Sequence, residues 1–156
     1  MSLTTARTHT AAPFRPAAGP HSQMAQNIVV AWACGSRFLE LKTVQTLDEL
    51  DVNKPCIDLQ DEGYNVEWSQ ELKVYESFDE YLRAWVLIHA LHRKLGFPGE
   101  SPGVIFNMSV GYNLEGILSP TVQRFLDRMQ KCTEEKNDKI DRLAKFYPRV
   151  RELDIP

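Results

Sequence analysis

The residues best placed to do chemistry lie where two apolar segments end. The first segment, residues 37–44, has the sequence RFLELKTV and finishes with a cation, Lys42, and a hydroxyl group, Thr43. The second segment, residues 104–110, is an apolar run that contains Asn107. Each reads as a short buried strand, and in α/β folds ligands bind at the carboxyl ends of such strands. The first hypothesis is therefore a ligand-binding or catalytic site at these two strand ends.

Lys42 is the member of this set whose position needs a physical reason. A buried ammonium group costs free energy unless something negative lies near it. Lys42 can therefore face an anionic ligand, form an ion pair with Glu40 two residues before it, or extend its charged end to solvent. The segment alone favours the third explanation.

Composition bounds the class of protein. The chain has 156 residues, of which 43% are hydrophobic and 25% charged, values typical of one globular domain. A formal net charge of −3 favours neither a nucleic-acid nor a membrane partner. The three cysteines are far apart and form no C-x-x-C motif, which predicts free thiols in the cytoplasm. Residues 1–12, rich in Ser, Thr and Ala, read as a flexible tail, with a short transit peptide as the alternative.

Helical periodicity surrounds the two strands. Apolar residues recur at helical spacing after Ser22, which is expected to cap the helix, and Gly35 is expected to end it. A longer helix is predicted over residues 78–95, with Ser77 and Glu80 as its capping box. That helix is apolar on nearly every side, so we expect it to be well covered by protein. Two more helices are predicted to begin at Ser119-Pro120 and at Thr133.

Strands that alternate with helices predict parallel β/α units. The segment 45–76 interrupts these units and is long for a connection within a compact domain, and such segments are usually either functional or unstructured. Because the segment contains Tyr64 and Trp68, we expect it to be ordered.

Two familiar patterns are present only in part. Residues 111–116 begin and end with glycine and follow a strand, as a phosphate loop does, but Ile117 stands where lysine is required. His89 and His92 are three residues apart on the long helix, yet no carboxylate motif accompanies them. Packing is therefore favoured over a metal site at this pair, and no metal site is predicted.

The small and polar residues beside the strand ends share a chemistry that suits a flat heterocycle. Small residues let a planar ring lie against the backbone, and a fixed lysine can stabilise the negative charge that develops near N1 and C2=O of a reduced flavin. An asparagine offers both a donor and an acceptor to the edge of a uracil-like ring. None of these residues alone identifies a flavin site. The prediction rests on all of them occurring in this order along the chain. The set comprises Ala17, Ala18, Gly19, Lys42, Thr43, Asn65, Glu67, Asn107 and Ser109.

Several longer motifs resemble one enzyme family. The matching segments are 16–21 (PAAGPH), 26–29 (QNIV), 40–44 (ELKTV), 54–58 (KPCID), 64–69 (YNVEWS) and 105–117 (IFNMSVGYNLEGI). Together they resemble the amino-terminal part of selenate reductase-type subunits, which are relatives of dihydropyrimidine dehydrogenase and dihydroorotate dehydrogenase. The resemblance runs in one register from about Pro13 to at least Ile117.

The resemblance implies an FMN-binding (β/α)8 barrel that moves a hydride between flavin and substrate. It also implies a role for each residue of the set. Ala17, Ala18 and Gly19 would lie under the flavin after the first strand; Lys42 would contact the flavin as the catalytic lysine, with Thr43 beside it; Asn65 and Glu67 would bind the substrate; and Asn107 would lie at the end of the third strand and help to bind the cofactor.

The fold expected for residues 13–156 is a partial (β/α)8 TIM barrel, roughly the first three β/α units with parallel strands. The expected function is that of an oxidoreductase fragment whose parent protein transfers hydride or electrons through FMN to or from a small heterocyclic substrate. No residue indicates oxyanion chemistry. The resemblance therefore supplies the name selenate reductase but does not predict selenate as the substrate. FMN binding is expected to be weak or absent in this chain alone, which would then be inactive.

The expected partners are a small-molecule substrate, the rest of the barrel and the redox module of full-length relatives. The alternative function is a non-catalytic interaction or assembly module. In that case the open edge of the sheet would pair with another chain, and self-association would follow.

Overall fold

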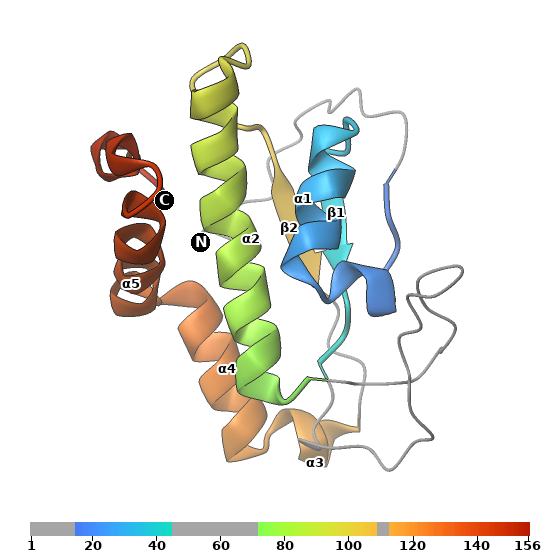
Figure 1. Cartoon of the computed structure of the whole chain (residues 1–156). Coiled ribbons are helices and arrows are strands. Elements are labelled where there is room, and N and C mark those ends of the chain that lie inside the picture. The colour runs from blue at the N-terminus through green and yellow to red at the C-terminus, as the bar shows by residue number, and fades with distance from the viewer. Residues whose placement is uncertain (1–14, 45–71, 109–112) are drawn as a thin grey trace.

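The computed structural model describes residues 15–44, 72–108 and 113–156, and these residues form helices packed on a short sheet (Figure 1). The tail predicted over residues 1–12 lies outside them, as does most of the segment 45–76. No described helix is both long and apolar enough to span a membrane. In chain order the elements are the 3₁₀ turn η1 (Pro20–Ser22), α1 (Ala25–Ala33), β1 (Phe38–Leu41), α2 (Val74–Leu95), β2 (Ile105–Met108), α3 (Leu114–Ile117), α4 (Pro120–Gln130), α5 (Thr133–Ala144) and the 3₁₀ turn η2 (Pro148–Glu152).

The two strands are neighbours and run parallel, as the alternation of strands and helices predicts. Phe38 lies opposite Ile105, and Glu40 lies opposite Asn107. The first strand is shorter than its predicted range; the second begins at Ile105, one residue later than predicted, and Ser109 and Val110 of its predicted range lie outside the described residues. The described part of the chain is therefore a mixed α/β arrangement with two parallel strands, which is compatible with part of a barrel but does not close one.

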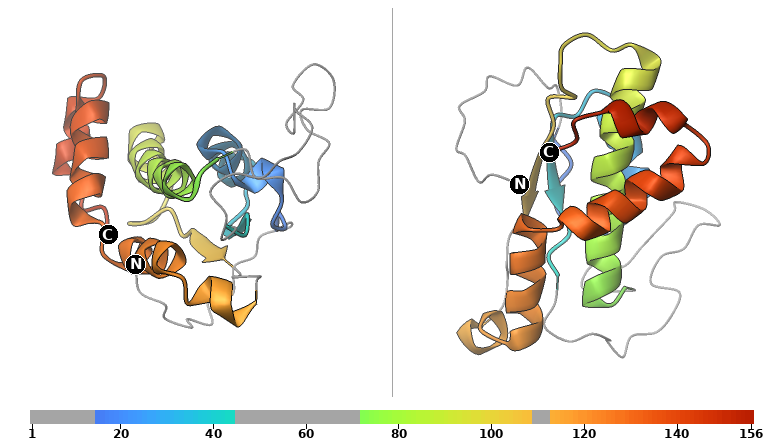
Figure 2. Two further views of the ribbon diagram at one scale, coloured as in Figure 1. Left: turned by 90° about the horizontal axis from the view of Figure 1, so that it is seen from below. Right: turned by 90° about the vertical axis from the view of Figure 1, so that its left-hand side faces the viewer.

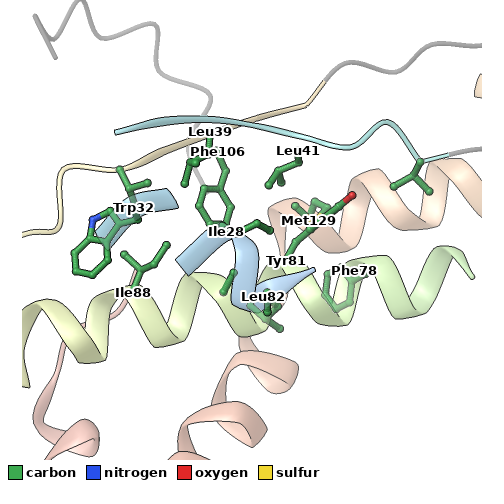
Figure 3. Packing of buried hydrophobic residues seen from close by; sticks show 14 of the residues in the cluster. Ile28, Trp32, Leu39, Leu41, Phe78, Tyr81, Leu82, Ile88, Phe106 and Met129 are labelled. Carbon is green, nitrogen blue, oxygen red and sulfur yellow. The ribbon is translucent and has the colours of Figure 1, made fainter. Parts of the chain in front are cut away.

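The helices cover one face of the sheet. Leu39, Leu41 and Phe106 point from the strands toward the helices, where they pack against residues such as Ile28 and Tyr81 (Figure 3). Successive residues of a strand point to opposite faces, so Glu40 and its neighbour Asn107 face away from the helices. The core therefore lies on the helix side of the sheet, and the opposite face carries Glu40 and Asn107 together with Phe38 and Ile105.

The long helix α2 is buried on two sides. One side packs on the sheet and α1, while the other packs against a second cluster in which Val86 and Ala90 meet Ala144, Val150 and Ile155 from the end of the chain. Figure 2 shows α5 on the side of α2 that faces away from α1. The prediction that protein covers this helix is confirmed for most of its length, and the two clusters explain its apolar circumference; its last residues, 93–95, are exposed, including Leu95.

The predicted start of α2 is wrong, because the helix begins at Val74 rather than at residue 78. Ser77 and Glu80 therefore form no capping box. The residue that caps the helix locally is Glu76, whose carboxylate accepts from Lys73 N–H at 2.8 Å. Ser77 and Glu80 fit the S-x-x-E pattern of a capping box, whereas Lys73 and Glu76 do not, so the local pattern favours a start one turn too late.

The predicted cap of α1 is also wrong, for a related reason. Ser22 lies in η1 rather than at the helix start, and the residue before the first helical position is Met24, whose side chain cannot cap. The first N–H group of α1, that of Ala25, donates instead to the buried carboxylate of Glu80 at 2.7 Å. A glutamate of α2 thus caps α1 across the helix interface.

Two other helix ends follow the prediction. Gly35 ends α1 with φ +105°, a conformation that residues with a Cβ rarely adopt, and its N–H group donates to Trp32 C=O at 2.9 Å. Ser119 caps α4 by accepting from Val122 N–H at 3.4 Å, with Pro120 in the first turn. These ends are set by local chemistry, so the sequence predicts them.

Three polar contacts on one face of α2 hold the amino-terminal segment in place. They lie at positions 77, 80 and 81, which helical spacing puts on the same side. Gln23 Nε2 donates to Ser77 Oγ at 3.2 Å, Ala25 N–H donates to Glu80 at 2.7 Å, and Tyr81 OH donates to Lys42 C=O at 2.7 Å.

Glu80→Ala should lower the free energy of unfolding by about 2 kcal/mol, because it leaves the buried Ala25 N–H group without a partner. The matched control is Glu152→Ala, which removes an exposed ion pair with Arg149 and should change stability by less than about 0.5 kcal/mol. Urea or thermal unfolding measures both variants. Equal stability of the two variants would contradict a structural role for Glu80.

Candidate functional site

The turn at residues 17–19 lies at the carboxyl end of the sheet. Glu40 N–H of β1 donates to Pro16 C=O at 3.3 Å, and Lys42 N–H donates to Ser22 C=O at 3.4 Å. The chain therefore passes beside β1 in the same direction and then turns back into α1, as a strand–loop–helix connection does in a β/α unit. This arrangement puts the predicted small-residue segment beside the predicted strand end.

The turn is fixed from one side by Ser22, which is buried. Ser22 Oγ accepts from Gly19 N–H and donates to Gly19 C=O, each at 3.1 Å. A Cβ atom on Gly19 would lie 2.9 Å from Cε1 of His21, so a larger residue here would push that ring away. Ala17 and Ala18 are exposed, which leaves the backbone of the turn open to a ligand.

Glu40 reaches the same turn from the face of the sheet opposite the helices. Its carboxylate accepts from Ala18 N–H at 3.4 Å, and its register neighbour Asn107 is exposed. From the sequence alone, Glu40 is predicted only as a possible ion-pair partner of Lys42. Among the described residues no such ion pair forms. The one feature of the sequence that could point to the contact between Glu40 and the turn is the presence of an acidic residue within an otherwise apolar strand.

Lys42 is 8% exposed, so its ammonium group does not extend freely into solvent. Burial lowers the pKa of Lys42, because a low-dielectric environment disfavours the charged form. Its main chain is held by the Tyr81 hydroxyl, which is itself buried and whose pKa is raised by desolvation. The alternation of β1, continued by one residue, puts Lys42 on the same face as Glu40.

The structure therefore brings most of the predicted set to one end of the sheet. The turn residues Ala17, Ala18 and Gly19 lie beside Glu40, which is opposite Asn107 in the other strand, and Lys42 and Thr43 follow at the end of β1. The predicted substrate residues Asn65 and Glu67 lie outside the described residues, as does Ser109.

Other features of the described residues belong to the helix side of the sheet. An apolar cavity of about 90 Å³ lies between α2, β2 and α4, lined by residues that include Trp85, Phe106 and Met129. His89 Nδ1 is 2.8 Å from Trp85 C=O and His92 Nε2 is 3.2 Å from Pro98 C=O, so both rings contact main-chain oxygens. No cluster of three or more His, Cys, Asp or Glu side chains in the described part of the chain is arranged to hold a metal ion.

Comparison with known proteins indicates what the chain is related to. The family model described as "Oxidoreductase YgfK, N-terminal TIM-barrel domain" matches residues 1–152. Proteins named "Putative oxidoreductase YgfK" from Escherichia coli strain K12 and from Escherichia coli O157:H7 are each 52% identical to the chain over 124 residues. These matches cover 80% of the chain but 12% of each relative, so the chain spans a small part of the relatives' length. No solved structure matches the chain.

Lys42→Met should leave the free energy of unfolding unchanged or raise it by up to about 1 kcal/mol at pH 7, since methionine keeps the apolar stem and removes a buried charge. The pKa of Lys42 is lower in the folded than in the unfolded chain, so the unfolded chain binds more protons and wild-type stability rises with pH up to the usual lysine pKa of 10.5. The advantage of Lys42→Met should accordingly shrink as the pH rises.

Unfolding by urea at several pH values tests this prediction. Lys145→Met, at an exposed lysine, is the control and should show no such pH-dependent difference. A loss of more than about 1 kcal/mol in Lys42→Met would instead assign Lys42 to a stabilising ion pair.

Proposed function

Because the chain belongs to the family of the oxidoreductase YgfK N-terminal TIM-barrel domain, we propose that it forms the first β/α units of an FMN-binding (β/α)8 barrel. The observation that carries this proposal is the exposed small-residue turn fixed next to the buried Lys42. A barrel of this kind takes about 250 residues. The proposed activity therefore belongs to a longer protein, of which this chain would contribute one part of the site.

The residues of the turn suit the flat ring of a flavin. Ala17 and Ala18 expose their backbone, and their small side chains let a planar group approach it. Gly19 and Ser22 keep the turn compact through their mutual hydrogen bonds. A flavin bound there would accept or donate a hydride, and the turn would orient its ring.

Lys42 would supply the positive charge next to that ring. Its burial makes its charge more effective, because electrostatic interactions strengthen where water is excluded. No carboxylate among the described residues neutralises it through an ion pair. We propose that Lys42 stabilises the reduced flavin, with Thr43 and Asn107 as further cofactor contacts.

The substrate would be a small, flat heterocycle that stacks near the flavin. We propose that Asn65 and Glu67 bind it, in line with the family resemblance of the segment 64–69. The cytoplasm is the proposed compartment, because Cys34 and Cys132 are free thiols. Further electron carriers would come from the longer protein.

A second function is favoured by one feature of the sheet. The outer edge of β2 has no strand paired to it among the described residues. Unpaired N–H and C=O groups of such an edge can recruit another strand. The alternative proposal is therefore an assembly module without catalysis, in which β2 pairs with a strand of another polypeptide.

A polypeptide that extends this chain through all eight β/α units should be yellow when purified and should hold FMN stoichiometrically, because the remaining loops of such barrels bind the phosphate. The 156-residue chain alone should bind added FMN weakly or not at all, and should self-associate. Flavin absorbance and sedimentation test both statements. A colourless extended polypeptide that stays colourless with added FMN would refute flavin binding and leave the assembly function.

In the extended polypeptide, Lys42→Met should lower the flavin reduction potential by about 30 mV, equivalent to about 1.4 kcal/mol for a two-electron couple. The cause is the loss of a positive charge that stabilises the reduced ring. Spectroelectrochemical titration measures it, with Lys145→Met as the control at an exposed lysine. An unchanged potential would remove Lys42 from the flavin site.

A further inference from the structure

We infer that Glu40 is a positioning residue whose carboxylate holds the Ala17–Gly19 turn in the conformation that receives the flavin ring. The inference rests on the proposed function, because the turn is the proposed platform for the flavin. Glu40 makes one contact to the residue before this turn and one to the turn itself: its N–H group donates to Pro16 C=O at 3.3 Å, and its carboxylate accepts from Ala18 N–H at 3.4 Å. Only the second contact depends on the side chain, so the inference concerns that contact.

The side chain at position 40 is unusual for its place in the sheet. Its neighbours in β1, Leu39 and Leu41, are fully buried in the core, and strands generally favour apolar and aromatic residues over glutamate. Glu40 forms no ion pair with Lys42 among the described residues, although the two are only two positions apart. The hydrogen bond from Ala18 gives this carboxylate a partner and a reason for its position.

The turn needs such a restraint because of its own composition. Ala17 and Ala18 are exposed and carry side chains too small to hold the backbone by packing. Ser22 restrains the turn at Gly19 from the α1 side, and Glu40 restrains it at Ala18 from the sheet side. Together they order a backbone that a ligand would otherwise have to order on binding, which would weaken its affinity.

The arrangement also separates the two charges at the strand end. One carboxylate oxygen of Glu40 accepts from the turn, and within the described part of the chain Glu40 and Lys42 form no ion pair. Lys42 would therefore be available to a ligand. Glu40 would thus act through the turn and need not touch the reacting atoms.

The test compares Glu40→Ala with Glu40→Gln in the polypeptide extended through all eight β/α units. Amide hydrogen exchange at Ala18 is measured without ligand, and the Kd for FMN is measured by quenching of flavin fluorescence. Glu40→Ala should speed exchange at Ala18 and raise the Kd about tenfold, equivalent to about 1.4 kcal/mol. Glu40→Gln keeps an acceptor oxygen and should restore both values to within about twofold of wild type.

Glu76→Ala is the matched control, since Glu76 also accepts a backbone N–H group, that of Lys73, at the start of α2. It should leave both measurements unchanged. Unchanged exchange at Ala18 in Glu40→Ala would overturn the inference, and so would faster exchange with an unchanged Kd, which would make Glu40 a structural residue only. Failure of the wild-type polypeptide to bind FMN would instead refute the proposed function, and the flavin role of Glu40 with it, while exchange at Ala18 would still report the contact.

Discussion

The buried carboxylate of Glu80 is the interaction on which the placement of the amino-terminal segment depends. It accepts from Ala25 N–H at 2.7 Å and from the Arg83 guanidinium at 2.7 Å, so a glutamate that is only 8% exposed has both a backbone donor and a counter-ion. Hydrogen bonds to charged groups contribute more than neutral ones, about 1.5–3 kcal/mol each. Because the contact fixes where α1 begins, it also fixes where the preceding turn meets β1.

The same face of α2 reaches the other side of the site through Tyr81. Its hydroxyl holds the main chain of Lys42, while the phenol ring packs in the core beneath β1. One helix therefore sets the position of both halves of the candidate site, the turn through Glu80 and the strand end through Tyr81. Glu40 and Asn107 of the candidate site face away from α2, whereas the apolar cavity that borders this helix lies on the helix side of the sheet.

The parts of this arrangement that could be predicted from the sequence are those with a local cause. Gly35 and Ser119 end and begin helices through contacts within a few residues, and the apolar runs around Leu39 and Phe106 mark buried strands. The sequence pattern assigns Glu80 to a capping box in its own helix because such a box is a local pattern, whereas its partner, Ala25 N–H, is 55 residues away. The sequence does not predict the short helix α3 or the turn η2, since neither is long enough to show helical periodicity.

The residues of the candidate site also differ in whether the sequence predicts their role. Lys42 could be singled out because a cation at the end of an apolar strand is expensive, and its burial in the structure sharpens that argument. The role of Glu40 could not, because it arises from a hydrogen bond to Ala18, 22 residues earlier in the chain. Sequence spacing favours pairing Glu40 with Lys42, whereas the fold gives the carboxylate to the backbone of the turn. This difference matters for the proposed function: an ion pair with Glu40 would neutralise Lys42 within the protein, whereas without that pair the lysine would be available to negative charge on the proposed flavin.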